Sequence, residues 1–477
     1  MVFSSLIFIF IFLPLVLVSY YIAPRRLRNT VILLASLLFY AWGEPTYIIL
    51  IIISILINYL GALLIRVHIK NKDKSKFIFI TLLLIDISIL FFFKYYGFAI
   101  ECLGSIIGLD LKVKSISLPL GISFYTFQQI SYIADIYMQK VKPERNLIDF
   151  ATYITMFPQL IAGPIVKYDD IHKQLANRKE SINKFGEGVQ RFIIGLGKKV
   201  ILANNIGVIS TQVKEVNLND LSIVLSWIGI IAFTLQIYFD FSGYSDMAIG
   251  LAKMFGFDFL ENFDYPYISK SITEFWRRWH MSLGGWFREY IYIPLGGNKK
   301  GTLIQVRNLF IVWFTTGLWH GASTNFVVWG LYFGVILFIE KIYLKDLLKK
   351  IPSIFSHIYT LIIVMIGWVI FDMNTLTDSG HYIKIMFGFG NNIFIDNLAK
   401  YILTNNFIIL LIGLICSTKL IKIYMNKIKS TFRENDVFLI TAINLLILII
   451  STAYLVGASY NPFLYFRFDS VKFRMKK

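Results

Sequence analysis

Two histidines lie in dense groups of polar and aromatic side chains and could do acid–base chemistry. His320 follows the apolar run Leu309–Trp319 and precedes Gly321, and His280 ends the segment Thr273–His280. Acyl transfer to a hydroxyl requires a base that removes the hydroxyl proton, and imidazole suits that task at neutral pH. Burial lowers the pKa of a histidine and so keeps it in the base form. His320 is therefore a candidate general base, with a histidine hydrogen-bonded inside a helix bundle as the alternative.

Charged and hydroxyl side chains share this part of the sequence. Arg277 and Arg278 could pair with the phosphates of a coenzyme or of a carrier protein's pantetheine, or they could mark the cytoplasmic side of a membrane. A second group could position a substrate or hydrogen-bond a histidine, or it could form a polar clasp within the fold. Its members are Asp240, Ser242, Tyr244 and Asp246.

The sequence lacks the motifs of several other reaction centres. Cys102 and Cys416 are the only cysteines, too few for a disulfide framework or for a zinc site of the usual ligand number. No His-x-x-x-His pair and no Gly-x-Ser-x-Gly motif occurs, and the turn at Gly296 and Gly297 lacks the lysine of a phosphate-binding loop. We therefore expect no metal site.

The composition indicates which elements must position these side chains. Of 477 residues, 56% are hydrophobic and only 16% are charged, whereas soluble domains average about 25% charged residues. The net charge of +18 comes from lysines and arginines that cluster between apolar runs, as expected for membrane orientation and contact with anionic lipid. No soluble basic module remains that would bind nucleic acid. These features predict an all-α polytopic protein of the lipid bilayer.

Apolar runs recur along the chain and, at about 20 residues each, predict about 11 crossings, give or take two. The first run, Phe3–Tyr21, lacks the basic start of a secretory signal and is expected to be retained. The basic loops Arg25–Arg28 and Arg66–Lys76 are separated by two runs, which places both on the cytoplasmic side and the N-terminus outside. The basic tail Val471–Lys477 is expected to be cytoplasmic as well.

Two apolar segments are interrupted by proline and glycine. Leu118–Tyr137 and Phe150–Ile165 contain these residues together with polar side chains such as Gln159. This pattern is typical of broken or re-entrant helices that line a cavity, with kinks of ordinary spans as the alternative. Since no repeat or soluble segment interrupts the chain, we expect a single membrane domain over residues 1–477. Its expected parts are N-terminal spans at 1–97, a core with the active site at 118–345 and C-terminal spans at 346–477.

Three motifs resemble those of the membrane-bound O-acyltransferase family, and the best match is its bacterial alginate O-acetylation branch. The motifs are DFSGYSDM at Asp240–Met247, FWRRWH at Phe275–His280 and GLWHG at Gly317–Gly321. Supporting marks are Phe157–Pro164, Tyr40–Gly43 and Pro462–Phe466.

The resemblance implies a helical membrane fold with a central funnel and a re-entrant floor. It also implies that His320 is the essential catalytic residue and that His280 contributes from the cytoplasmic side. Members of this branch pass an acyl group, usually acetyl, from a cytoplasmic donor toward an extracytoplasmic acceptor such as exopolysaccharide or peptidoglycan. A periplasmic or surface-exposed partner transferase often reaches that acceptor. We therefore expect a bacterial cytoplasmic-membrane enzyme that uses acetyl-CoA and holds no bound cofactor.

On this interpretation, acetyl-CoA docks near Arg277, Arg278 and His280, and its thioester reaches His320. Charge on the thioester oxygen needs a hydrogen-bond donor, for which Trp319, Asn308 and Tyr244 are the candidates. The full set of expected donor- and substrate-binding residues is Arg277, Arg278, Trp279, Asp240, Ser242, Tyr244, Asp246, Gln159, Asn308 and Trp319.

Two other functions stay open at this point. One branch of the same family hands D-alanine from a small carrier protein toward teichoic acid, although the long region after His320 fits the acetyl-transferring branch better. A transporter without chemistry of its own is the alternative from another class. A transporter needs no reactive histidine, so substitution of His320 separates it from an acyltransferase.

Overall fold

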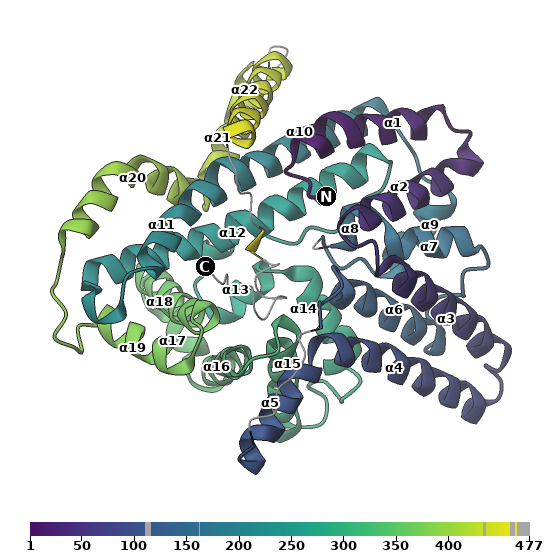
Figure 1. Ribbon diagram of the computed structural model, residues 1–477, viewed down its shortest axis with the longest axis horizontal. Coiled ribbons are helices and arrows are strands. Elements are labelled where there is room, and N and C mark those ends of the chain that lie inside the picture. The colour runs from purple at the N-terminus through teal and green to yellow at the C-terminus, as the bar shows by residue number, and fades with distance from the viewer. Residues whose placement is uncertain (110–115, 162, 433–435, 458–462, 465–477) are drawn as a thin grey trace. The chain divides into compact units, whose positions relative to one another are not determined.

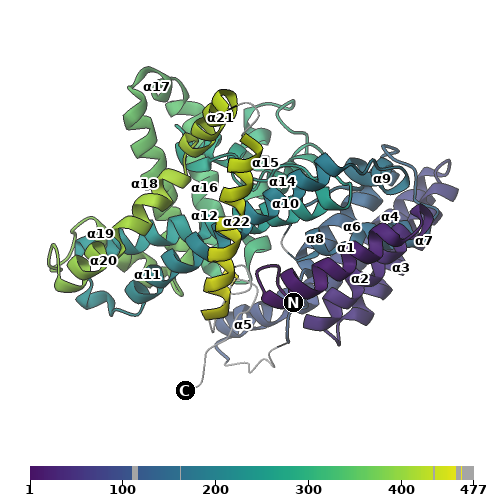
Figure 2. The same cartoon turned by 90° about the horizontal axis from the view of Figure 1, so that it is seen from above.

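The computed structural model describes the chain except residues 110–115, 162, 433–435, 458–462 and 465–477. Every secondary-structure element in the described part is a helix, as the composition predicts (Figures 1 and 2). By length and composition, eight of these helices can cross a membrane, and two shorter apolar helices cover Phe8–Ile22 and Tyr96–Ile107. The expected number of about 11 crossings stays a prediction. The chain is thus a polytopic, all-α membrane protein, and the predicted cytoplasmic tail Val471–Lys477 lies outside the described residues.

The chain forms two compact units that are interleaved in the sequence. Among the described residues, unit 1 consists of residues 1–192 and 244–261, and unit 2 consists of residues 193–243 and 262–464. Two of the unit boundaries fall within helices, α10 (Ile182–Gly197) and α12 (Ile223–Met254), and a third lies in the loop after α12. The single domain and the internal boundaries that the sequence predicts stay a prediction.

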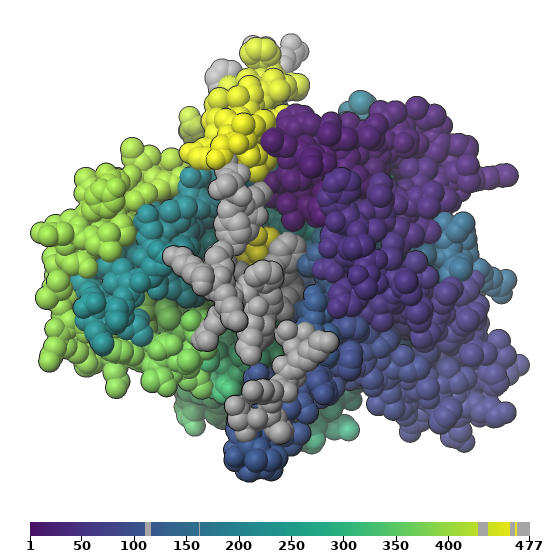
Figure 3. Space-filling view, in the orientation of Figure 1, coloured from purple at the N-terminus to yellow at the C-terminus, as the bar shows by residue number. Residues whose placement is uncertain are grey.

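Unit 1 begins with apolar helices whose outward-facing side chains are exposed, as expected for surfaces in contact with lipid. Leu15, Val18 and Ile22 on α1 are 63%, 57% and 79% exposed. The first helices form the purple and blue surface of Figure 3. Besides parts of α10 and α12, the helices of unit 1 are η1 (Phe8–Phe12), α1 (Leu13–Ile22), η2 (Arg25–Leu27), α2 (Arg28–Gly43), α3 (Ile48–Val67), α4 (Lys72–Lys94), α5 (Tyr96–Ile107), α6 (Ile122–Tyr137), α7 (Leu147–Thr155), α8 (Phe157–Leu160) and α9 (Tyr168–Ala176).

Of the two segments that contain proline and glycine, Phe150–Ile165 is broken into separate helices, whereas Leu118–Tyr137 holds one uninterrupted helix, α6, that begins after Pro119 and Gly121. α7 ends at Thr155, and α8 has only four residues with Pro158 in its first turn. α6 begins after Gly121, whose φ of +72° is a conformation that favours glycine. A Cβ at Gly121 would lie 2.3 Å from the carbonyl oxygen of Leu160, so glycine also permits the close approach of these two segments. Neither α7 nor α8 is long enough to cross a bilayer.

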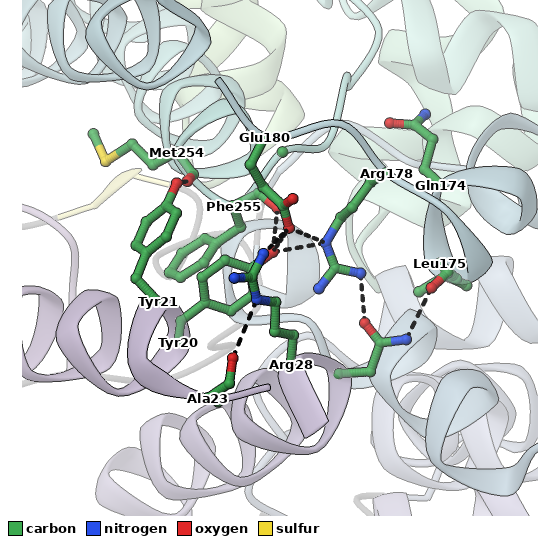
Figure 4. Close-up of polar contacts among 12 residues, drawn as sticks. Tyr20, Tyr21, Ala23, Arg28, Gln174, Leu175, Arg178, Glu180, Met254 and Phe255 are labelled. Carbon is green, nitrogen blue, oxygen red and sulfur yellow. Dashed lines mark hydrogen bonds and ion pairs between the residues drawn. The ribbon is translucent and has the colours of Figure 1, made fainter. Parts of the chain in front are cut away.

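A polar network fastens the hairpin of α1 and α2 within unit 1 (Figure 4). Glu180, between α9 and α10, accepts a hydrogen bond from the Tyr20 hydroxyl at 2.8 Å and pairs with Arg28 at 2.7 Å. The guanidinium of Arg178 donates to the Tyr20 hydroxyl at 2.8 Å and to the side chain of Asn29 at 2.6 Å. The start of the chain is thereby tied to the segment that leads into α10.

Unit 2 contains the closely packed hairpin of α15 (Thr302–His320) and α16 (Thr324–Ile339). A Cβ at Gly317 would lie 2.3 Å from the carbonyl oxygen of Phe326, and one at Gly330 would lie 2.2 Å from that of Trp313. Small residues at such contacts are typical of membrane helix pairs. The other helices of unit 2 are η3 (Lys198–Ala203), α11 (Asn204–Lys214), η4 (Leu218–Asp220), η5 (Pro266–Ile268), α13 (Ile272–Arg278), α14 (Met281–Phe287), η6 (Arg288–Tyr292), η7 (Glu340–Leu344), α17 (Lys345–Lys350), α18 (Ser353–Asp372), α19 (Leu376–Met386), α20 (Asn397–Cys416), α21 (Leu420–Phe432) and α22 (Asp436–Gly457), together with parts of α10 and α12.

Candidate active site

His320 is the last residue of α15 and is half-buried among aromatic rings. Its ring centroid lies 5.0 Å from those of Trp319 and Trp329 and 5.5 Å from that of Phe371, and all three contacts are edge-on. A Cβ at Gly321 would lie 2.2 Å from the ring of another phenylalanine, so the residue after His320 must be small. These contacts restrain the direction of the His320 ring at the end of the helix.

His280 is buried in unit 2, between α13 and α14 and outside the candidate membrane spans. Its φ of +46° is in the left-handed region, which is uncommon for a residue with a side chain. Asn262 holds this turn, because its backbone oxygen accepts from the Met281 N–H at 3.0 Å. Its Oδ1 accepts from the N–H and the hydroxyl of Ser282, at 3.1 and 2.9 Å. The same Oδ1 lies 3.2 Å from Nδ1 of His280.

Trp319 contacts the rings of both histidines. Its ring centroid is 6.0 Å from that of His280 and 5.0 Å from that of His320. His280 also contacts Phe241 of α12 edge-on at 4.7 Å and Phe263 at 6.4 Å. The structure thus brings the two histidines that the sequence singles out into one aromatic environment, although 40 positions of sequence separate them.

Burial lowers the pKa of His280 to about 3, because desolvation disfavours the charged imidazolium. The ring is therefore neutral at physiological pH. Its Nε2 is buried and has no hydrogen-bond partner among the described residues. A neutral ring in this setting is a weak base, but its open nitrogen can still take part in a hydrogen bond with a ligand.

Arg277, at the end of α13, lines a pocket of about 880 Å³ in unit 2. Basic side chains from two parts of the sequence surround this pocket. One part is α13 with the residues before it, and the other is η7 with α17. The five basic residues are Lys270, Arg277, Lys341, Lys345 and Lys349.

The two carboxylates that line this pocket already have partners. Glu274 pairs with Arg278 at 2.9 Å. Glu340 accepts hydrogen bonds from the backbone N–H groups of Ile272 and Thr273, at 2.6 and 2.8 Å. The excess of positive charge makes the pocket suitable for an anion such as phosphate.

Arg278, Trp279 and Asn308 contact other parts of the fold. Arg278 pairs with two carboxylates at 2.6 and 2.9 Å. Trp279 packs its ring against Trp368 at 5.0 Å. The Nδ2 group of Asn308 donates to two backbone carbonyls of the turn after η6, at 3.2 and 3.1 Å. These contacts give each side chain a structural role, whatever else it binds.

Asp240 and Ser242 lie on the part of α12 that belongs to unit 2. Asp240 pairs with the buried Lys199 of η3 and accepts a hydrogen bond from the backbone N–H of Leu464 at 2.8 Å. Asp240 therefore ties three distant parts of the sequence together, as a polar clasp would. The hydroxyl of Ser242 is buried and has no partner among the described residues.

Tyr244, Asp246 and Gln159 belong to unit 1. The ring of Tyr244 stacks on Phe3 at 4.7 Å. Asp246 accepts a hydrogen bond from Arg191 at 2.9 Å. Gln159 is buried, and its amide N–H donates to a backbone carbonyl of α7. Their expected contribution to substrate binding stays a prediction.

Asn262 and the lysines of the pocket are not among the site residues expected from the sequence. Asn262 lies in a loop that has no motif, 18 positions before His280, and only the folded chain shows their contact. The lysines at 341–350 form a cluster of positive charge in the sequence. That cluster was a usable signal, but the sequence alone did not show that it meets Arg277.

A sequence model of the membrane-bound O-acyltransferase family matches residues 139–374. The chain is 42% identical to the protein named "Probable alginate O-acetylase" of Pseudomonas putida, over 82% of this chain and 81% of that protein. It is 33% identical to the peptidoglycan O-acetyltransferase of Helicobacter pylori, over 84% of this chain and 82% of that protein.

A teichoic acid D-alanyltransferase of Bacillus subtilis is 29% identical, over 53% of this chain and 68% of that protein. The similarity to the two proteins named for O-acetylation thus extends over more of the chain than the similarity to this D-alanyltransferase.

Proposed function

Because the chain belongs to the membrane-bound O-acyltransferase family, we propose that it passes an acetyl group from cytoplasmic acetyl-CoA across the membrane for O-acetylation of an extracytoplasmic polysaccharide. The acceptor class is exopolysaccharide or peptidoglycan, in line with the names of the O-acetylating relatives that match 82% and 84% of the chain. The observation that carries the proposal is the series of ring contacts from His280 through Trp319 to His320. This series of contacts begins at His280, just after α13, and α13 contributes Arg277 to the basic pocket.

In the proposed reaction, His320 takes the proton of the acceptor hydroxyl while the hydroxyl oxygen forms a bond to the thioester carbonyl carbon. The carbon–sulfur bond then breaks, and His320 returns the proton to the leaving thiolate of the coenzyme. The acceptor hydroxyl belongs either to a sugar or to a serine of a partner transferase. The aromatic rings around His320 support this role, because they restrain the imidazole and limit the access of water.

Negative charge develops on the thioester oxygen during the attack and requires a hydrogen-bond donor. The indole of Trp319 is favoured for this role by its contact with both histidine rings. The amide N–H groups of Asn308 donate instead to backbone carbonyls. Tyr244 belongs to the other unit.

The basic pocket supports acetyl-CoA as the donor. Its volume of about 880 Å³ and its five cationic side chains suit the phosphates of a coenzyme. From this pocket, the pantetheine arm would extend past His280 toward His320. The same chemistry would accept a carrier protein's phosphopantetheine, which would be the donor if the chain transferred D-alanine.

The proposal includes an orientation and partners. The chain would lie in the bacterial cytoplasmic membrane with its N-terminus outside and its C-terminus in the cytoplasm, because its basic loops are expected on the cytoplasmic side. A periplasmic or surface-exposed acetyltransferase would deliver the acetyl group to the polysaccharide. The lipid bilayer is the surrounding medium, and nucleic acid is not an expected partner.

The test uses the purified full-length protein in lipid nanodiscs with acetyl-CoA labelled in its acetyl group. We expect wild type to release coenzyme A or to transfer the label, and His320→Ala to lose this activity at least about 100-fold. The variant must keep the thermal unfolding midpoint of wild type, and His381→Ala on α19 is the matched histidine control. Equal turnover by wild type and His320→Ala would exclude the proposed base. Transfer only from an acylated carrier protein would favour the D-alanyl alternative.

A further inference from the structure

The geometry around Asn262 determines which nitrogen of His280 carries the proton. Oδ1 of Asn262 accepts from the backbone N–H of Ser282 at 3.1 Å. A backbone N–H can only donate, so the atom that it faces must be the amide oxygen and not the amide nitrogen. The neighbouring ring nitrogen, Nδ1 of His280 at 3.2 Å, faces an acceptor and must therefore be the protonated one.

The proton on Nδ1 leaves a lone pair on Nε2 of a neutral imidazole. This Nε2 is buried and without a hydrogen-bond partner among the described residues. Phe241, Phe263 and Trp319 contact the ring of His280, and none of these three side chains carries a charge. Leaving a buried acceptor without a hydrogen bond costs free energy. A ligand that donates a hydrogen bond to Nε2 would recover that cost.

We propose that Asn262 is a positioning residue that fixes His280 as the Nδ1–H tautomer, so that the Nε2 lone pair accepts a hydrogen bond from an amide N–H of the pantetheine arm. This inference rests on the proposed function, because it takes coenzyme A as the donor. The pantetheine arm is chosen because Arg277 of the basic pocket precedes His280 by three residues, and the arm carries amide groups between its phosphates and its sulfur.

Asn262 also holds the backbone that aims the ring. Its carbonyl accepts the Met281 N–H at 3.0 Å, and its Oδ1 binds Ser282, so both residues after His280 are fixed. The left-handed φ of +46° at His280 is kept by these bonds and by the Gly284 N–H, which donates to the His280 carbonyl at 3.1 Å. The side chain of Asn262 thereby fixes the tautomer of the His280 ring, and the backbone and side chain of Asn262 together fix the direction of that ring.

The first measurement is nitrogen NMR of the full-length protein, labelled with ¹⁵N-histidine in nanodiscs, with His280→Gln to assign the signals. We expect a protonated Nδ1 and an unprotonated Nε2 for His280. Ser282→Ala removes another donor to the same oxygen and should leave this tautomer unchanged. A protonated Nε2 in wild type would overturn the proposal, even if the acetyltransferase activity is found.

The second measurement is the dissociation constant of coenzyme A as a function of pH. Asn262→Asp keeps an acceptor for Nδ1 but adds a negative charge that favours the imidazolium, whose Nε2 has no lone pair. We expect its binding to be about tenfold weaker than that of wild type at pH 6 and to recover as the pH rises, while binding by wild type stays constant. A purely structural role for Asn262 predicts weakening that does not change with pH, and that result would overturn the proposal.

Two further variants separate the nitrogens of His280. The amide oxygen of glutamine can replace Nε2, whereas asparagine reaches only as far as Nδ1. His280→Gln should therefore bind coenzyme A more tightly than His280→Asn, and the reverse order would contradict the proposal. If wild type shows the expected tautomer but does not bind coenzyme A, the ligand named here is wrong and the proposed donor fails with it.

Discussion

At the scale of single residues, the buried His280 should make the protein sensitive to acid. Its pKa is lowered to about 3 in the folded protein, below the ordinary histidine value of 6.5. The unfolded chain therefore binds a proton that the folded chain excludes. His280 therefore does not reduce the free energy of unfolding above pH 6.5, but it reduces this free energy increasingly as the pH falls from 6.5 toward 3. Between pH 7.5 and pH 5 the loss from this residue is about 2 kcal/mol.

Thermal unfolding midpoints at pH 7.5 and pH 5 test this prediction. His280→Phe should lose less stability on acidification than wild type, because phenylalanine cannot take up a proton. His381→Phe on the partly exposed face of α19 is the control and should show the wild-type difference. If His280→Phe and wild type lost the same stability, His280 would not be the group that excludes the proton.

From the sequence, individual site residues can be singled out only where a motif marks them. His280 and His320 lie in short motifs rich in tryptophan and glycine, and the structure brings both against Trp319. Asn262 has no such mark, since its contact with His280 depends on how a loop folds back. The partners of Asp240 were unpredictable for the same reason, because Lys199 and Leu464 come from distant parts of the chain.

At the scale of helices, the Glu180 network should hold the hairpin of α1 and α2 in place. Burial raises the pKa of Glu180, but hydrogen bonds from Tyr20 and Arg28 outweigh it and lower the pKa overall. Glu180→Gln removes the charge that faces Arg28 and should cost about 3 kcal/mol at pH 7. This stability is present above the ordinary carboxyl pKa and is lost as the pH falls. The free energy of unfolding of Glu180→Gln should therefore fall less on acidification than that of wild type.

Unfolding midpoints in detergent measure this cost, with Glu187→Gln as the control. Glu187 pairs with Lys253 at 2.7 Å but is 61% exposed, so its loss should cost only about 0.5 kcal/mol. Similar shifts for both variants would mean that the network near α1 contributes no more than a surface ion pair.

The helix formed by η7 and α17 should contribute to donor affinity. Lys341→Ala/Lys345→Ala removes two of the cations that line the pocket. We expect the KM for acetyl-CoA to rise about tenfold with little change in kcat, because phosphate binding is lost but the histidines are kept. Acetyl-pantetheine lacks these phosphates and should react equally with both proteins. The control is Lys384→Ala on α19, and a fall in kcat alone would argue against a phosphate site.

Helix interruptions were predictable because they have a local cause. α7 ends before Met156, and α8 begins at Phe157 with Pro158 in its first turn, where a proline is well tolerated. The close packing of α15 on α16 was less accessible to prediction. Gly317 is visible in the sequence, but its fit against the carbonyl oxygen of Phe326 depends on how two helices are paired.

At the scale of the whole molecule, the charge pattern and the helix lengths lead to one topology. The basic loops Arg25–Arg28 and Arg66–Lys76 lie at the start of α2 and at the end of α3. α3 is long and apolar enough to cross a membrane, whereas α2 has only 16 residues. Both loops are basic, and the positive-inside rule favours the cytoplasm for both. That arrangement requires α2 to cross as well, although it is shorter than the usual span of about 20 residues.

Single cysteines in a variant that lacks Cys102 and Cys416 test this topology with a membrane-impermeant maleimide on spheroplasts. Arg26→Cys and Lys70→Cys should react only after the membrane is permeabilised, and Thr46→Cys, between α2 and α3, should react without it. All three positions are exposed in the structure, so a lack of reaction before permeabilisation reports the membrane and not burial. Opposite sides for positions 26 and 70 would show that only one of the two helices crosses. Reaction of both without permeabilisation would reverse the orientation, and the basic pocket could then no longer be placed in the cytoplasm from the charge pattern.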